Sequence, residues 1–191
     1  NTPTIPIRDL EIQKEEDDLV AASFGRGFFI VDDYSPIREF STDILSKEGY
    51  LFSIKDVMQY IVTAPEKTAT GHNFFTSPNP PYGLKLSYYI KNDLKNKYEK
   101  RIEVENYKFK KGETINYPTK KDLEEEAKEK SPKTLLTILS EDGKVIRRIT
   151  GKNKKGYHEN YWDLRTYSHR NIEEEEEFSG PLVPPGKYFV Q

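Results

Sequence analysis

The stretch that decides the fold class is LLTILSEDGKVIRRI, which runs from Leu135 to Ile149. Two strand-like runs, 135–139 and 145–149, flank a short polar segment with Asp142-Gly143 at its centre. Asp-Gly between two such runs is the strongest short-range signal for a β-hairpin, because glycine readily adopts the positive φ that a tight turn requires. We therefore expect two antiparallel strands here.

Further strands are expected on both sides of this hairpin. Residues 84–90 alternate apolar and polar side chains, which is typical of a strand with one buried face. Shorter runs predict strands at 160–165 and 187–190, and residues 57–62 are also compatible with a strand. Short strands separated by turn signals favour a β-sandwich.

The N-terminal part predicts a second hairpin. Apolar runs at 19–24 and 28–31 flank the corner Gly25-Arg26-Gly27, and the second run ends at Asp32-Asp33. A short strand is expected before them, around the isoleucines and leucine of residues 5–12.

Two helices are expected. Apolar spacing predicts a short helix over 36–46, and residues 119–130 predict a surface helix with Thr119 as its N-cap. The rest of 91–131 reads as charged loops and turns. The expected fold class is thus mainly β, with one or two short helices.

Composition excludes several classes of protein. The 191 residues carry a net charge of −2, so they have no general attraction to nucleic acid. There is no cysteine, which excludes disulfides and thiolate metal sites, and no apolar run long enough to span a membrane. The 13 Tyr and 10 Phe suit the flat faces of β-sheets.

Two groups of segments carry a resemblance to known proteins. Ile7-Arg8-Asp9 and the stretch from Asp18 to Asp33 resemble the closing segment of a β-propeller in bacterial sortilin-like, BNR-repeat, glycosyl hydrolase-like proteins. Residues 79–90, 138–149, 161–165 and 180–188 resemble the immunoglobulin-like or fibronectin-like module that follows the propeller. No Ser-x-Asp-x-Gly-x-Thr-Trp box of the propeller repeat occurs in the sequence.

The resemblance implies a domain organisation. Residues 1–40 would be the tail of the last propeller blade, and 41–66 a connector. Residues 67–191 would form an immunoglobulin-like β-sandwich, which we expect to be truncated at its last strand.

The resemblance also implies a function. The chain would be a non-catalytic accessory or interaction module at the C-terminal end of a larger exported protein, located in the periplasm, on the cell surface or outside the cell. Its partners would be the other blades of the parent protein, and a carbohydrate or another protein. No cofactor or metal is expected. One alternative is a carbohydrate-binding module; another is a fragment of a glycoside-hydrolase-like enzyme whose active site lies in the other blades.

Candidate ligand-binding residues are Arg26, Asp32, Asp33 and Trp162. Arg26 would point toward a propeller channel and contact an anionic ligand. The ordinary alternative is that Arg26 forms a structural ion pair. The two adjacent aspartates suit turn chemistry better than a glycosidase pair, because neighbours on a strand point to opposite faces. Trp162 would stack on a sugar if exposed, although a single Trp on a sandwich strand is usually part of the core. No catalytic residue is assigned, since the three histidines are scattered and no nucleophile motif is present.

Overall fold

The computed structural model describes residues 4–25, 27–61, 79–167 and 179–191. The protein is mainly β, with several small antiparallel sheets and few helices, in agreement with the expected fold class at this level. The strands are β1 (Ile7–Gln13), β2 (Asp18–Ser23), β3 (Gly27–Val31), β4 (Gly49–Leu51), β5 (Leu84–Ile90), β6 (Thr134–Ser140), β7 (Val145–Gly151), β8 (Gly156–Trp162), β9 (Arg165–Tyr167), β10 (Ser179–Leu182) and β11 (Tyr188–Val190). The helices are α1 (Ser35–Glu39), α2 (Thr42–Ser46), α3 (Lys97–Lys111) and α4 (Lys120–Lys128).

The central hairpin is confirmed. β6 and β7 pair antiparallel from Thr134↔Gly151 to Leu139↔Val145, and Gly143 turns between them with a φ of 76°. β11 joins the other edge of β6, which gives a three-stranded sheet in the order β11-β6-β7.

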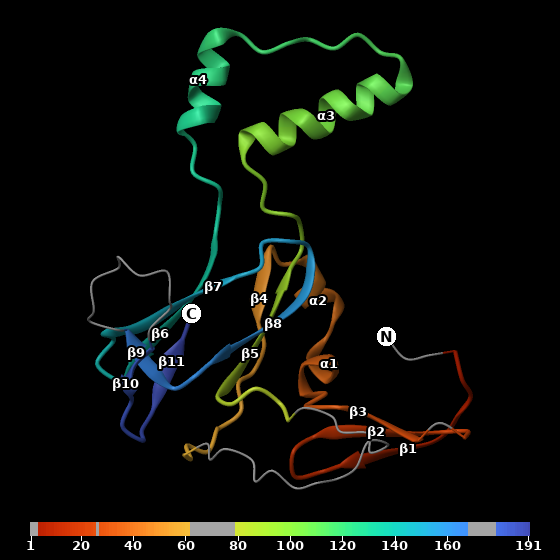
Figure 1. Ribbon diagram of the computed structural model, residues 1–191, viewed down its shortest axis with the longest axis vertical. Helices are drawn as coiled ribbons and strands as arrows, with labels where there is room; N and C mark the ends of the chain where they lie inside the picture. Colours follow the sequence, from red (N-terminus) through yellow and green to blue (C-terminus); the bar gives the residue numbers. More distant parts are fainter. Residues whose placement is uncertain (1–3, 26, 62–78, 168–178) are drawn as a thin grey trace, which may run out of the picture.

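A second sheet has the order β4-β5-β8, with both pairs antiparallel. We call this sheet and the sheet β11-β6-β7 together the two-sheet body (Figure 1). The alternation of β5 sends Tyr88 into the main core and Tyr89 into a smaller cluster on the other face, as the two-residue period of a strand requires.

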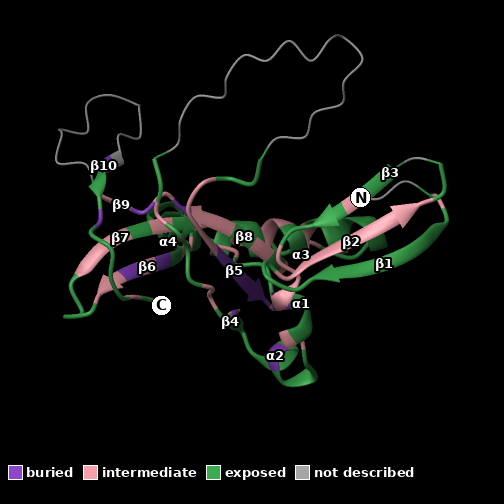
Figure 2. Cartoon of the chain, turned by 90° about the horizontal axis from the view of Figure 1, so that it is seen from below, coloured by how far each residue is buried: buried purple, intermediate pink, exposed green. Residues whose placement is uncertain are grey.

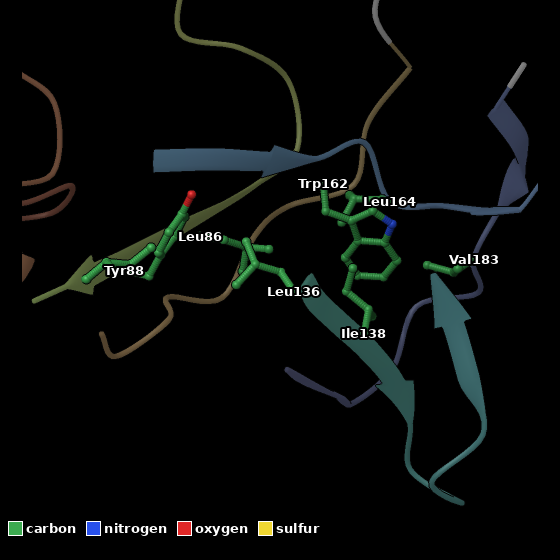
Figure 3. Close-up of a cluster of buried hydrophobic side chains, with 8 residues drawn as sticks. Leu86, Tyr88, Leu136, Ile138, Trp162, Leu164 and Val183 are labelled. Carbon is green, nitrogen blue, oxygen red and sulfur yellow. The ribbon is translucent and has the colours of Figure 1, made fainter. Parts of the chain in front are cut away.

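The main core lies between these sheets (Figure 3). Its buried members come from β5, β6, β8 and the segments after β8 and β10: Leu86, Tyr88, Ile90, Leu136, Ile138, Trp162, Leu164 and Val183. Aliphatic and aromatic side chains of this kind supply most of the free energy of folding through removal of apolar surface from water.

The N-terminal sheet is β1-β2-β3, and its strands pair in sequence order. The expected hairpin of β2 and β3 and the preceding strand are therefore confirmed. Every residue of β1 is exposed, and the sheet extends away from the two-sheet body (Figures 1 and 2).

Helices α3 and α4 form an arm that projects from the opposite end of the molecule (Figure 1). Each begins with a capping box, Asn96 with Glu99 in α3 and Thr119 with Asp122 in α4. Neither helix contains a buried residue, and Arg101 of α3 joins them through two hydrogen bonds of 2.8 and 2.9 Å to Glu126. Among the described residues, no helix is both long and apolar enough to cross a lipid bilayer.

Four local predictions need correction. The helix expected over 36–46 is divided at Phe40, where the backbone is extended and Ser41 starts α2 as its N-cap. Residues 57–61 form no strand, because no neighbouring strand pairs with them. The expectation of one or two short helices is wrong, because residues 97–111, which were expected to form charged loops and turns, form the 15-residue helix α3. Strand β8 is longer than expected and begins at Gly156.

Candidate functional site

The structure places the predicted site residues in separate regions. Asp32 and Asp33 follow β3, at the point where the N-terminal sheet meets the two-sheet body. Trp162 lies at the end of β8, inside the main core. Arg26 lies outside the described residues. Asp32 and Asp33 thus belong to one polar cluster, and Trp162 does not join it.

Two turns bring the cluster together. Asp17, before β2, has a φ of 59°, and Asp33, after β3, has a φ of 49°. Aspartate tolerates this left-handed backbone region better than most residues. The turns are tied by two hydrogen bonds, from the Tyr34 amide to the Asp17 carbonyl at 2.8 Å and from the Asp33 amide to Asp18 at 2.9 Å. The result is a pair of carboxylates at one end of the N-terminal sheet.

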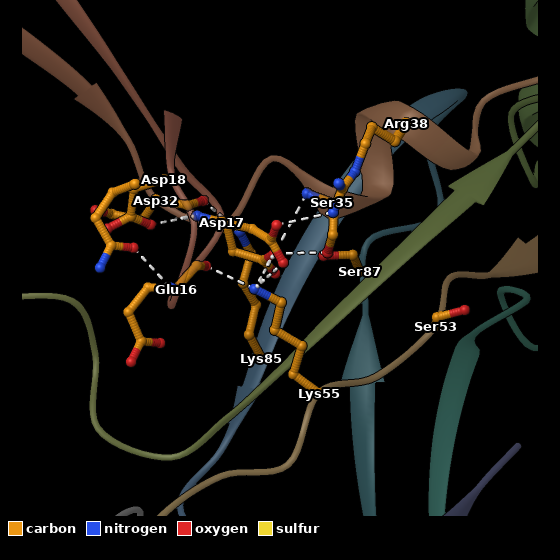
Figure 4. Close-up of polar contacts among 12 residues, drawn as sticks. Glu16, Asp17, Asp18, Asp32, Ser35, Arg38, Ser53, Lys55, Lys85 and Ser87 are labelled. Atoms are coloured by element: carbon orange, nitrogen blue, oxygen red, sulfur yellow. Dashed lines mark hydrogen bonds and ion pairs between the residues drawn. The ribbon is translucent and has the colours of Figure 1, made fainter. Parts of the chain in front are cut away.

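Lys55 is the centre of this cluster, which we call the Lys55 junction (Figure 4). Its Nζ lies 2.9 Å from Oδ2 of Asp17, 3.1 Å from Oδ1 of Asp33 and 2.6 Å from the carbonyl oxygen of Glu16. Arg38 of α1 adds a second cation, 2.8 Å from the other oxygen of Asp17. Lys55 belongs to the chain that follows β4, so the junction fastens the N-terminal sheet to the two-sheet body.

A second lysine continues the junction on β5. Lys85 donates a hydrogen bond of 3.1 Å to the carbonyl oxygen of Asp32 and pairs with Glu159 of β8 at 2.9 Å. The hydroxyl of Tyr157 donates a hydrogen bond to Glu159 at 2.7 Å and accepts one from the hydroxyl of the buried Ser87 at 2.9 Å. Asp32 therefore contributes its backbone to the junction, whereas Asp33 contributes its carboxylate.

The junction shifts the pKa values of its charged groups. The hydrogen bond from Lys55 lowers the pKa of Asp17, although partial burial opposes this. For Asp33, burial raises the pKa, but hydrogen bonds from Ser35 and Lys55 outweigh it and the pKa is lowered overall. Burial also opposes the charge on Lys55, yet its bonds to both aspartates raise its pKa. Burial raises the pKa of Tyr157 far above its ordinary value. All three members of the ion cluster are therefore charged at neutral pH.

This arrangement suits attachment better than catalysis. A general acid and base need proton affinities near the working pH, whereas Asp17, Asp33 and Lys55 are shifted away from it. The ammonium group of Lys55 occupies the space between the carboxylates of Asp17 and Asp33, where a bound metal ion would otherwise lie. Within the described part of the chain, no group of three or more His, Asp or Glu side chains is arranged to hold a metal ion.

Sequence reasoning found part of the junction. Asp33 was selected as a candidate, but Asp17, Lys55 and Lys85 were not, because their partners are remote in sequence. The run of acidic residues at 15–18 was the one local signal of an ion pair. The run does not indicate which basic side chain pairs with it.

Trp162 has a different environment. Its side chain is 1% exposed, its Nε1 donates a hydrogen bond of 2.9 Å to the carbonyl oxygen of Arg165, and its ring meets Tyr188 edge-on with centroids 5.5 Å apart. The indole thus has its polar group satisfied and its ring packed. It presents no open ring face on which a sugar would stack.

The charge of Asp33 is expected to stabilise the fold in a pH-dependent way. Asparagine also tolerates a left-handed φ, so Asp33→Asn removes the charge without adding backbone strain. We expect a loss of about 0.5–1 kcal/mol in the free energy of unfolding at neutral pH, as for a partly exposed ion pair. Because the folded pKa is lowered, this stability is present above the unfolded pKa of about 3.9 and is lost as the pH falls through the folded pKa.

Urea unfolding of both proteins, from neutral pH down to about pH 2, checks this expectation. Asp56→Asn is the matched control, because Asp56 is exposed and makes no ion pair with another described residue. A difference between Asp33→Asn and the unsubstituted protein that is the same at every pH would contradict the assignment.

Comparison of the chain with protein-family models, with curated protein sequences and with solved structures found no match.

Proposed function

We propose that this chain is a non-catalytic accessory or interaction module whose N-terminal sheet continues a larger β-propeller. The observation that carries the proposal is that β1-β2-β3 bears apolar side chains on both of its faces, and that many of them are exposed.

The first face is apolar across two strands. Phe28 pairs with Ala22 and Ile30 with Val20, so all four side chains lie on the same side of the sheet. Phe28 is 74% exposed and Ile30 is 59% exposed. The β1 residues of this face are polar, which confines the apolar area to β2 and β3.

The second face is apolar across all three strands. Two rows of directly paired residues cross the three strands on this face. One row is Leu10, Ala21 and Phe29, and the other is Ile12, Leu19 and Val31. Leu10 is 57% exposed, and Ile12 and Val31 are exposed as well. Figure 2 shows the exposed residues running along β1 and β3.

A sheet of this kind needs cover on both sides. An antiparallel sheet in an isolated domain usually packs one face and leaves a polar face to water. Blades of a propeller stand side by side around an axis, so the faces of each blade are covered by its neighbours. The Lys55 junction holds the sheet at one end (Figure 4), and apolar side chains stay exposed on both faces, such as Phe28 on one and Leu10 on the other.

The two-sheet body is proposed as the immunoglobulin-like or fibronectin-like module that braces the propeller. Two antiparallel sheets that enclose a core with a buried Trp support this assignment. Export of the parent protein, to the periplasm, the cell surface or the medium, is part of the same proposal and rests on the resemblance of the sequence.

The rival functions have less support. Stacking of Trp162 on a carbohydrate would need an exposed ring, and the ring is buried. A glycosidase site at Asp32 and Asp33 would need two free carboxyl groups, whereas Asp33 is held by Lys55 and Ser35. Attachment to a larger β-structure is therefore the function that we put forward.

Hydrogen exchange of the N-terminal sheet tests this proposal. The outward amides of β1 and β3 are expected to exchange quickly in the isolated chain and at least 10-fold more slowly in the full-length parent protein, where neighbouring blades cover them. Amides of β6 and β7 are the internal control, because their hydrogen bonds lie within the two-sheet body in both proteins.

Equal exchange of β1 and β3 in both proteins would overturn the proposal. A parent protein without further blades would do so as well.

A further inference from the structure

We propose that the cavity beside β11 is a binding slot for one extended peptide strand of a partner polypeptide. The slot has a volume of about 560 Å³ and lies between residues 54–59 and β11. The proposal does not depend on the propeller assignment, because no residue of β1, β2 or β3 lines the slot.

The backbone of β11 provides the first argument. Gln191 and Thr137 exchange two backbone hydrogen bonds, of 3.0 and 2.8 Å. Hydrogen-bonded and non-hydrogen-bonded pairs alternate along antiparallel strands, so Phe189 also directs its N–H and C=O toward β6. Tyr188 and Val190 therefore direct theirs away from β6, toward the free edge.

These outward groups are not used elsewhere in the described parts of the chain. No hydrogen bond joins the backbone of Tyr188 or Val190 to another described residue. Residues 54–59 form no strand, and they make no backbone–backbone hydrogen bond within the described residues. The edge of β11 thus offers two donors and two acceptors to a ligand.

The apolar floor of the slot provides the second argument. It is formed by the end of the main core, where Trp162, Leu164 and Val183 meet (Figure 3). The side chains of Tyr188 and Val190 complete this side, and those of Ile54 and Val57 lie across from it. Side chains that reach this floor must therefore be apolar, because a polar group there would lose its water without gaining a partner. The slot also has a polar side, formed by Lys55, Asp56 and Gln59.

An extended peptide satisfies both requirements at once. Its backbone pairs with the edge, and every second side chain points to the same face. The two peptide residues opposite Tyr188 and Val190 lie two positions apart, so both side chains point into the slot. A small hydrocarbon would fill the floor but leave the backbone groups of β11 without partners.

The probe is a capped synthetic peptide, Lys-Thr-Val-Thr-Val-Thr-Lys, whose two valines occupy the inward positions. Binding is measured by isothermal titration calorimetry on the whole chain. The matched control peptide carries N-methyl groups on both valines, whose N–H groups would face β11. We expect it to bind at least 10-fold more weakly, whereas N-methylation of the central threonine, whose N–H points away, is expected to leave affinity unchanged.

The matched protein variant is Val190→Pro. Proline removes the N–H that points to the free edge and keeps the hydrogen bonds between β11 and β6, and edge strands tolerate it there. We expect at least a 10-fold loss of affinity with the fold retained, as judged by circular dichroism. Phe189→Ala is the control, because this exposed side chain points to the other face of the strand.

Equal binding to Val190→Pro and to the unsubstituted protein would overturn the proposal, because strand pairing would then not be the mode of recognition. Absence of binding at millimolar peptide would overturn it as well. If Val190→Pro does not fold, the N-methylated peptides on the unsubstituted protein decide between the same two outcomes.

Discussion

Replacing Trp162 with alanine is expected to lower the free energy of unfolding by about 3–5 kcal/mol, the range for truncating a large aromatic side chain in a core. Trp162 is 1% exposed and packs between the two sheets of the body, so its removal leaves a cavity that the neighbouring strands cannot close without losing their pairing. Alanine also leaves the carbonyl oxygen of Arg165 without the indole donor.

Urea unfolding followed by circular dichroism measures this loss. Trp162 is the one tryptophan in the sequence, so fluorescence is suitable only for the unsubstituted protein, in which it reports directly on burial. Phe109→Ala is the control, because Phe109 is 75% exposed on α3 and its truncation is expected to cost less than about 0.5 kcal/mol. A loss below about 1 kcal/mol for Trp162→Ala would show that the indole is not part of the core.

Replacing Gly83 with alanine is expected to be similarly severe, with a loss of about 3 kcal/mol or more. Gly83 precedes β5 with a φ of 119°, a value that side chains with a Cβ rarely adopt. A Cβ at this position would lie 2.0 Å from the carbonyl oxygen of Trp162 and 2.8 Å from its carbonyl carbon. Because both are backbone atoms, β5 and β8 would have to separate where Leu84 pairs with Trp162.

Gly112→Ala separates the cost of a positive φ from the cost of close backbone contact. Gly112 ends α3 with a φ of 68°, but apart from its own chain neighbours and helix backbone, nothing lies within 4 Å of the position of its Cβ. We expect its substitution to cost about 1 kcal/mol, from backbone conformation alone. Similar losses for the two variants, in the same urea experiment, would mean that close approach of the strands is not what requires glycine at Gly83.

Local sequence patterns predicted the elements whose signals are contained within a few residues. The turn at Gly143, the alternation of β5 and the N-cap at Thr119 each depend on neighbours along the chain. The same holds for the hairpin of β2 and β3, and for the last strand after Pro184-Pro185-Gly186.

Helix α3 shows where this reading of the sequence was incomplete. Its apolar residues are few and are separated by charged ones, and none of them is buried, so the strong apolar stripe that indicates a packed helix is absent. The signals that were present are at its ends: Asn96 three residues before Glu99, and Gly112 with a left-handed φ. The opposite error occurred at 57–61, where apolar residues suggested a strand but no partner strand lies beside them.

The sequence by itself determined the class of secondary structure, the position of most strands and the expectation that a single Trp would lie in the core. Only the tertiary structure decided that Lys55 joins Asp17 and Asp33, and that both faces of β1-β2-β3 carry exposed apolar side chains. It also decided that β11 lies beside a cavity, with an edge that pairs with no described strand. The physical reason is the range of the interactions. Turns, caps and alternation depend on adjacent residues, whereas ion pairs, sheet faces and strand edges depend on residues that folding brings together from distant parts of the chain.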